Sequence, residues 1–445
     1  MEQEIKLSNI FHLAWPSVIS HAIVILVSII DLAFVGRISQ TTLAIAAVAI
    51  ANNICAGIYN FLEGIRTGTT ILTSRFLGAK KHNAISKTLN LAFIFAIIIG
   101  VFLLFITPPL VKFLYGFIED TSVRNIGISY ISIRLLGIPF LLIIFAITGF
   151  YRGLKNTIIP LTITLTICFL NATLNYLFIN GKLGLPMMGT NGAAYATLTT
   201  YIIATFLVIA LLFRTKSTAK YINFTIPIKS IFKEYVKTGS EIGLYHGMTI
   251  IAFFAFVFMF IQLGTQAIAT HQIVLQVFLI LNLIPTGLFV ATSIIIGKLL
   301  GGSHYAFANI AIKRLLIISL TLAAGINILV AVFAKNIASF FSPHDMLVAQ
   351  QATKSIYIIC VALIFNSLTL VLRGTLNAAK DTRFIAIACG TTGYFIFLPL
   401  AYFCGIKLGY GVFGGYVAFA IWFFIDCIVL THRLFVQKII PNSKN

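Results

Sequence analysis

Residues 64–78 read GIRTGTTILTSRFLG, and residues 287–301 read GLFVATSIIIGKLLG. The two stretches share a glycine at each end, Thr69 lies over Thr292, and Arg75 lies over Lys298. Self-similarity at one fixed separation indicates an internal repeat. The chain is therefore predicted to fold as two related copies of one unit.

The match extends beyond these two stretches. With a shift of 222 to 225 residues, glycines and loop motifs coincide: Gly149, Lys155, Asn156 and Thr157 lie over Gly374, Lys380, Asp381 and Thr382, and Gly189, Gly192 and Ala196 lie over Gly411, Gly414 and Ala418. We expect one copy at residues 1–213 and the other at 241–445. A polar stretch at 214–240 is predicted to be a cytoplasmic linker that ends in an interfacial helix.

The composition places both copies in a membrane. Hydrophobic residues make up 59% of the 445 residues and charged residues 9%, whereas soluble domains are about 25% charged. Apolar runs of about 20 residues, long enough to cross a bilayer, follow one another. Twelve are expected, at 13–36, 43–65, 89–110, 126–150, 158–179, 193–213, 242–263, 273–296, 312–333, 352–372, 384–404 and 412–430. The prediction is an all-α integral membrane protein with two six-helix bundles, related by a pseudo-two-fold axis along the membrane normal.

The net charge of +20 raises the question of a nucleic-acid partner. If the N-terminus is cytoplasmic, 22 of the 31 Lys and Arg residues fall on the inner side, seven on the outer side, and Arg66 and Arg134 inside helices. This asymmetry is the positive-inside pattern of membrane proteins, so nucleic acid is not expected to bind. It predicts a multi-pass membrane protein with cytoplasmic termini. We expect the protein in the plasma membrane of a bacterium or an archaeon.

Ionisable residues within the hydrocarbon mark candidate sites, because a charge there is costly. Asp31, near the outer end of the first segment, has Phe256 as its counterpart in the other copy. A carboxylate found in one copy only is not needed for a symmetric fold. Burial disfavours its charged form, so Asp31 could load and release a proton, or it could coordinate a cation such as sodium. The structural alternative is a residue at the outer mouth that pairs with Arg37 or reaches water.

Two further sets of polar residues share helix faces. Asn171 and Asn175 lie four residues apart, and their amides could bind a cation or water, or could join helices by hydrogen bonds. The second segment carries a stripe of polar residues, Asn52, Tyr59, Glu63 and Arg66, and its counterpart in the other copy carries Gln272 and Gln276. These residues could line a substrate cavity, or they could serve helix packing. Glu63 and Arg66 are one turn apart and can neutralise each other. His21 could be proton-active or a structural histidine.

Other residues receive structural interpretations. Arg134 and Asp426 are predicted to be ion-paired or to lie near an interface. Pro16, Pro139, Pro285 and Pro399 are predicted to mark helix bends. The sequence has no HExxH stretch and no metal-type pairing of its cysteines, so we expect neither an intramembrane enzyme nor a resident metal or cofactor.

Several motifs, in this order and spacing, resemble the multidrug and toxic compound extrusion (MATE) transporters, and specifically their DinF-like branch. The motifs are AWP at 14–16, DLAFVG at 31–36, YNFLEGIRTGTT at 59–70, LGA at 77–79, RG at 152–153, NT at 156–157, Asn171 with LNY at 174–176, NGAAYAT at 191–197, ATHQI at 269–273 and KDTR at 380–383. The resemblance covers nearly the whole chain.

The resemblance implies an antiporter that exports bulky, often cationic or amphipathic compounds by alternating access, driven by the entry of protons or sodium. It implies that Asp31 is the coupling residue, with Asn171, Asn175 and Thr197 as neighbours. Our hypothesis is that protonation of Asp31 lets the first helix bend near Pro16. Relatives often carry an aspartate where this chain has Asn175, which favours proton coupling. A flippase of lipid-linked precursors is the alternative. We expect a functional monomer that binds a small organic substrate, a coupling cation and the lipid bilayer.

Overall fold

The computed structural model of the chain describes residues 5–35, 41–118, 120–223, 229–343, 345–437 and 439–440. Among them, eleven helices are long and apolar enough to cross a membrane. A twelfth span is the pair α4 (Thr121–Leu135) and α5 (Ile138–Gly153), which meet at a bend of 44°. Pro139 lies in the first turn after this bend, as predicted. The fold is therefore the expected all-α membrane architecture.

The chain divides into two compact units. The N unit comprises residues 19–243, and the C unit comprises the described residues up to 18 and from 244 onward. The first and ninth helices, α1 (Leu7–Val35) and α9 (Lys229–Gln262), each contribute one part to each unit. Residues 229–240 are the start of α9 and not the separate interfacial helix expected at the end of the linker. The exact lobe boundaries stay a prediction.

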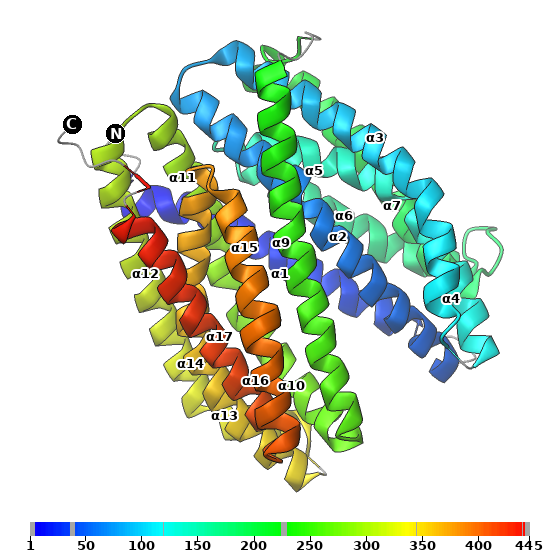
Figure 1. The fold of residues 1–445 in the computed structure, drawn as a ribbon. Helices are drawn as coiled ribbons and strands as arrows, with labels where there is room; N and C mark the ends of the chain where they lie inside the picture. The colour runs from blue at the N-terminus through cyan, green and yellow to red at the C-terminus, as the bar shows by residue number, and fades with distance from the viewer. Residues whose placement is uncertain are drawn as a thin grey trace. The chain divides into compact units, whose positions relative to one another are not determined.

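The N unit is built around α2 (Thr41–Gly78) and α5. Its other helices are α3 (His82–Tyr115), α4, α6 (Ile158–Asn180), α7 (Gly189–Arg214) and the short α8 (Lys216–Ala219), all labelled except α8 in Figure 1. Helix α2 packs on α3, α4 and α5, and α7 packs on α4, α5 and α6. Gly149 permits the close contact of α2 with α5, because an added Cβ would lie 2.4 Å from the backbone oxygen of Arg66.

The C unit is built around α14 (Met346–Ala378). This helix packs on α10 (Thr265–Leu281), α11 (Leu283–Gly301), α12 (Tyr305–Val332), α13 (Ala334–Phe341) and α17 (Gly411–Thr431). Helix α15 (Thr382–Thr391) continues through a π-helical turn, Thr392–Phe397, into α16 (Leu398–Tyr402). A second π-helical turn, Phe403–Lys407, follows α16, and a third, His432–Val436, follows α17. Gly374 brings α14 close to α11, since an added Cβ would lie 3.0 Å from the oxygen of Phe289.

The two close contacts lie at matching places in the repeat. Gly149 of α5 faces the stretch that begins at Gly64, and Gly374 of α14 faces the stretch that begins at Gly287. The repeated glycines therefore allow the same kind of helix contact inside each unit. This agrees with the two-copy prediction.

Candidate functional site

Asp31 lies on the part of α1 that belongs to the N unit, and its side chain is 3% exposed. The Nδ2 atom of Asn175, on α6, donates a hydrogen bond of 2.6 Å to Asp31 Oδ1. The same nitrogen donates to Asn171 Oδ1 at 3.1 Å, one helical turn away. The carboxylate is therefore held by a neutral amide within a buried polar cluster. Arg37, the alternative partner for Asp31, lies outside the described residues.

The hydrogen-bond chain continues onto α7. Asn171 Nδ2 donates to Thr197 Oγ1 at 3.2 Å, and Thr197 donates to the backbone oxygen of Ala193 at 3.1 Å. Gly192 explains why α7 approaches α6 so closely, since an added Cβ would lie 2.8 Å from the backbone of Phe178. The structure thus brings together all four residues that were predicted as the cation-coupling group.

The amide of Asn175 suits both protonation states of its neighbour. An ionised carboxylate only accepts hydrogen bonds, whereas a protonated one also donates. Asn175 Nδ2 supplies the donor, and its Oδ1 atom is buried without a hydrogen-bond partner. If the amide turns over, that oxygen faces the acid as an acceptor. An ionised aspartate at this position could not donate to an ionised Asp31.

A second polar cluster surrounds Arg134, near the end of α4. Its Nη1 atom donates to Asn52 Oδ1 at 2.5 Å and to the Tyr130 hydroxyl at 3.1 Å. The side chain is 8% exposed, and no carboxylate among the described residues lies within ion-pair distance. The predicted ion pair of Arg134 is therefore not found there. Its hydrogen-bond partners, an amide and a hydroxyl, are neutral. Tyr59, on the same helix as Asn52, is half-buried.

The inner part of the predicted α2 stripe forms a separate group. Arg66 donates to Glu63 through Nε at 2.6 Å, and its Nη2 atom lies 2.5 Å from the other carboxylate oxygen. This confirms that the two residues neutralise each other. The guanidinium of Arg66 also lies over the ring of Phe145. Arg152, on the neighbouring helix α5, is buried. The stripe is therefore divided between two clusters.

The remaining predicted residues do not join these clusters in the described contacts. His21 is half-buried on α1, in the N unit. Gln272 is exposed and Gln276 half-buried on α10, in the C unit. Helix α1 runs from Leu7 to Val35 without a break at Pro16, so bending at this proline stays a prediction.

The counterpart of Asp31 has a different environment. Phe256 is fully buried in the C unit and packs against Phe260, Phe397, Phe419 and His271. His271 Nδ1 forms a hydrogen bond of 2.9 Å with the Tyr416 hydroxyl. Sequence reasoning missed this buried histidine, although it lies within the ATHQI motif. An aromatic core thus occupies the place of the polar cluster.

The C unit does contain one buried ion pair. Arg373 Nη2 donates to Asp426 Oδ2 at 2.7 Å, which confirms the pairing predicted for Asp426. The other carboxylate oxygen accepts from the Thr392 hydroxyl at 2.5 Å, and Trp422 donates to that hydroxyl at 3.0 Å. Thr392 begins the π-helical turn after α15. The Asp426 carboxylate therefore joins three helical segments through Arg373 and Thr392.

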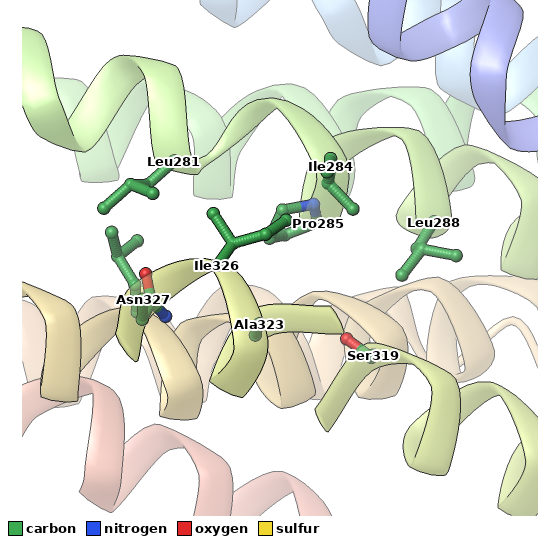
Figure 2. A pocket seen from close by; sticks show the side chains of 9 residues that line it. Leu281, Ile284, Pro285, Leu288, Ser319, Ala323, Ile326 and Asn327 are labelled. Carbon is green, nitrogen blue, oxygen red and sulfur yellow. The ribbon is translucent and has the colours of Figure 1, made fainter. Parts of the chain in front are cut away.

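A small pocket opens beside the break between α10 and α11. Figure 2 shows mainly aliphatic side chains around it, with Pro285 at the break and Asn327 on the facing helix α12. The space is about that of a single water molecule, whereas drug-sized ligands fill pockets of about 300 to 1,000 Å³. The pocket is therefore too small for bulky cargo, and the bend at Pro285 stays a prediction.

Comparison with known proteins identifies the family of the chain. The MatE family model matches residues 16–177 and 247–403. The chain is 26% identical, over 93% of its length and 91% of the relative's, to the probable multidrug resistance protein NorM of Bacillus subtilis. It is 28% identical to the protein of the same name from Bacillus cereus, over 97% of this chain and 96% of the relative.

Solved structures agree with the fold. A transporter of the MOP superfamily from Pyrococcus furiosus, whose description reports a binding pocket of reverse polarity, has a TM-score of 0.86 at 19% identity, over 98% of this chain and 96% of its own. A MATE transporter in the bent conformation has a TM-score of 0.88 at 19% identity, over 97% and 95% of the two chains.

Proposed function

We propose that this chain, which belongs to the MatE family, is a secondary active antiporter that exports bulky organic compounds in exchange for protons. Its cargo is expected to be cationic or amphipathic. Its relatives are named multidrug resistance proteins, which supports cargo of this class. The DinF-like branch stays a prediction.

The observation that carries the proposal is the buried carboxylate of Asp31, held by Asn175 in one unit and replaced by Phe256 in the other. A carboxylate removed from water is the most plausible proton carrier in a membrane, because its neutral form is favoured by burial. A sodium site would favour a second carboxylate, but the residue beside Asp31 is the amide Asn175. One carboxylate and its amide partner therefore suit a proton better than a sodium ion.

The coupling follows from the two protonation states. Ionised Asp31 accepts the hydrogen bond from Asn175, and the chain through Asn171 to Thr197 stays as observed. A proton taken from outside neutralises the carboxylate and makes it a donor, so the amide of Asn175 turns and the chain rearranges. The two states then differ in how α1 packs on α6 and α7, and bending near Pro16 would accompany the change. A ligand shifts such an equilibrium only through different affinity for its states.

We propose that the protein works as a monomer in a prokaryotic cytoplasmic membrane, which it crosses several times, with both termini in the cytoplasm. The uneven distribution of Lys and Arg between the two sides supports this orientation. We propose no enzymatic activity for the protein.

A flippase of lipid-linked precursors is the second candidate. The observation in its favour is the set of arginines inside the N unit, since Arg134 and Arg152 have no carboxylate at ion-pair distance among the described residues. Positive groups of this kind suit an anionic headgroup better than an organic cation. Transport assays with ethidium and with a fluorescent anionic lipid distinguish the two candidates, because an exporter of organic cations should move ethidium and a flippase should move the lipid.

The test of the proposal uses purified protein in proteoliposomes and follows ethidium transport under an imposed proton gradient. Asp31→Asn is expected to abolish proton-driven transport while the protein still folds. Asp120→Asn is the matched control, because Asp120 is an exposed carboxylate that caps α4 and asparagine caps equally well. Full proton-driven transport by Asp31→Asn would overturn the proposal.

A further inference from the structure

We propose that a pocket between the ends of α2 and α5 and the turn after α8 binds a phosphate group, carried either by a lipid headgroup or by a soluble compound. The pocket has a volume of about 270 Å³ and is lined by Leu77, Tyr151, Leu154, Asn156, Lys220 and Tyr221. All six residues belong to the N unit. None of them takes part in the Asp31 cluster, so this proposal goes beyond the proposed function and does not depend on it.

The wall of the pocket is built from anchored aromatic side chains. Tyr221 is buried, and its hydroxyl forms a hydrogen bond of 3.1 Å with His82 Nδ1 at the start of α3. Its ring packs edge-on against Phe150 of α5. Tyr151, on the same helix, donates a hydrogen bond of 3.3 Å to the Thr215 hydroxyl. The stretch that follows α7 is therefore fastened to α3 and α5, and the pocket is a formed feature of the N unit.

The second copy of the repeat provides an internal comparison. Asn156 lies over Asp381, and the two turns have the same backbone, since the preceding residues Lys155 and Lys380 have φ angles of 68° and 67°. The backbone nitrogens of Asn156 and Asp381 each donate to the oxygen five residues earlier, at 2.9 Å. In the C unit, Asp381 accepts from Arg433 Nε at 2.7 Å and from its Nη2 at 3.2 Å. There an ion pair joins the turn to the segment after α17.

The N unit lacks this ion pair. Helix α7 corresponds to α17 in the repeat, and the cation that lines the pocket after α7 and α8 is Lys220. Its neighbour across the pocket is the amide of Asn156, and no carboxylate in the described part of the chain lies within ion-pair distance of Lys220. The positive charge is therefore present in both copies, whereas its acidic partner is present only in the C unit.

The surroundings of the pocket are positive. Residues 64–118 and 121–233 contain no Asp or Glu, and every residue that lines the pocket lies within these ranges. Lys80 and Lys81 precede His82 in the turn between α2 and α3, Lys216 begins α8, and all three lysines are exposed. Lysines on this side follow the positive-inside pattern in any case. The open pocket and the amide in place of Asp381 are what distinguish this surface.

The donors of the pocket suit a phosphate group. Asn156 Oδ1 accepts from the backbone nitrogen of Ile159 at 3.1 Å, so the Nδ2 group of the amide remains as a donor. Lys220 adds a point charge with three donors, a usual phosphate ligand, and its ammonium lies 5.0 Å from the centre of the Tyr221 ring. Drug-sized ligands fill pockets of about 300 to 1,000 Å³, so this space suits a phosphate with a small attached group.

The test titrates purified protein in an uncharged detergent with inorganic phosphate or with phosphatidylglycerol, at an ionic strength held constant with chloride. The thermal midpoint is the readout, because a ligand that binds the folded state raises it. We expect a saturable rise with at least one probe. A rise with inorganic phosphate in the absence of lipid indicates a soluble source, and a rise with phosphatidylglycerol alone indicates a headgroup. No rise with either probe would overturn the proposal.

Two variants assign the binding to this pocket. Lys220→Gln removes the exposed charge, and Asn156→Asp places in the N unit the acid found in the C unit while keeping the acceptor for Ile159. Each should weaken the apparent affinity about tenfold, the effect of losing one charge-assisted hydrogen bond. Lys220→Arg keeps the charge and should bind as wild type does.

Lys112→Gln is the matched control, because Lys112 is an exposed lysine of the same unit that does not line the pocket. Wild-type affinity in both Lys220→Gln and Asn156→Asp would overturn the proposal, as would equal weakening in Lys112→Gln, which would show a response to net charge alone. Asp31→Asn should bind the probes as wild type does. A failure of the transport proposal therefore leaves this result unaffected.

Discussion

Asn175 Nδ2 lies 2.6 Å from Asp31 Oδ1, so the single buried carboxylate among the described residues of the N unit has an amide as its direct partner. The amide restricts which ions the site can bind. Conservative substitutions at this position therefore test the site. Replacing a nitrogen by an oxygen at this one atom would convert a hydrogen bond into a repulsion.

Asn175→Asp should make stability depend on pH. Two carboxylates in contact cannot both ionise without repulsion, so the folded variant holds one proton that is lost as the pH rises. We expect its thermal midpoint to fall from pH 6 to pH 9 more steeply than that of wild type. Asn180→Asp, at an exposed position of the same helix, is the matched control. Equal pH dependence in both variants would show that residue 175 does not contact an ionised group.

Thr197→Val should weaken both stability and transport. The substitution keeps the shape but leaves the Nδ2 group of Asn171 without its acceptor, at a cost of about 1 to 3 kcal/mol for a buried group. Thr200→Val is the control, because Thr200 is equally buried on α7 and bonds only to its own helix. Ethidium transport and thermal midpoints should separate the two variants, and equal effects would argue against the hydrogen-bond chain.

Asp426→Asn should destabilise the protein by about 3 to 5 kcal/mol, the usual penalty for leaving a buried partner charge uncompensated. Thr392→Val should also destabilise it, because the change removes a hydrogen bond to the carboxylate, about 1.5 to 3 kcal/mol for a charged acceptor, and leaves Trp422 Nε1 without its acceptor. The protein that remains folded should keep its proton-driven transport. A loss of coupling in folded Asp426→Asn would instead give this ion pair a part in transport.

Gly149→Ala should lower the thermal midpoint sharply, because the new Cβ would lie 2.4 Å from the backbone oxygen of Arg66 and would separate α2 from α5. Gly325→Ala, on α12, is the control. No atom lies within 4 Å of its new Cβ, and alanine favours the helix by about 1 kcal/mol. A neutral Gly149→Ala would show that these two helices can separate without loss.

Hydropathy and repeated glycines were sufficient to predict the spans and the two copies, because bilayer thickness and close helix contact constrain sequence directly. The Asp31 group was predictable from the burial cost of a carboxylate and from the family resemblance. The contact of Arg134 with Tyr130 follows helical spacing, since the two lie four residues apart on α4, but its contact with Asn52 was not predictable, because Asn52 lies on another helix. The position of Arg134 inside an apolar span was the available signal. The division of the α2 stripe was hidden for the same reason, since helical angle alone does not show which neighbour a side chain meets.

The Asn175 amide also has a consequence for how this protein can change over generations. Every asparagine codon becomes an aspartate codon through one base substitution, so a two-carboxylate site is a single mutational step away. We expect lineages or laboratory populations that depend on a sodium gradient to acquire this replacement readily.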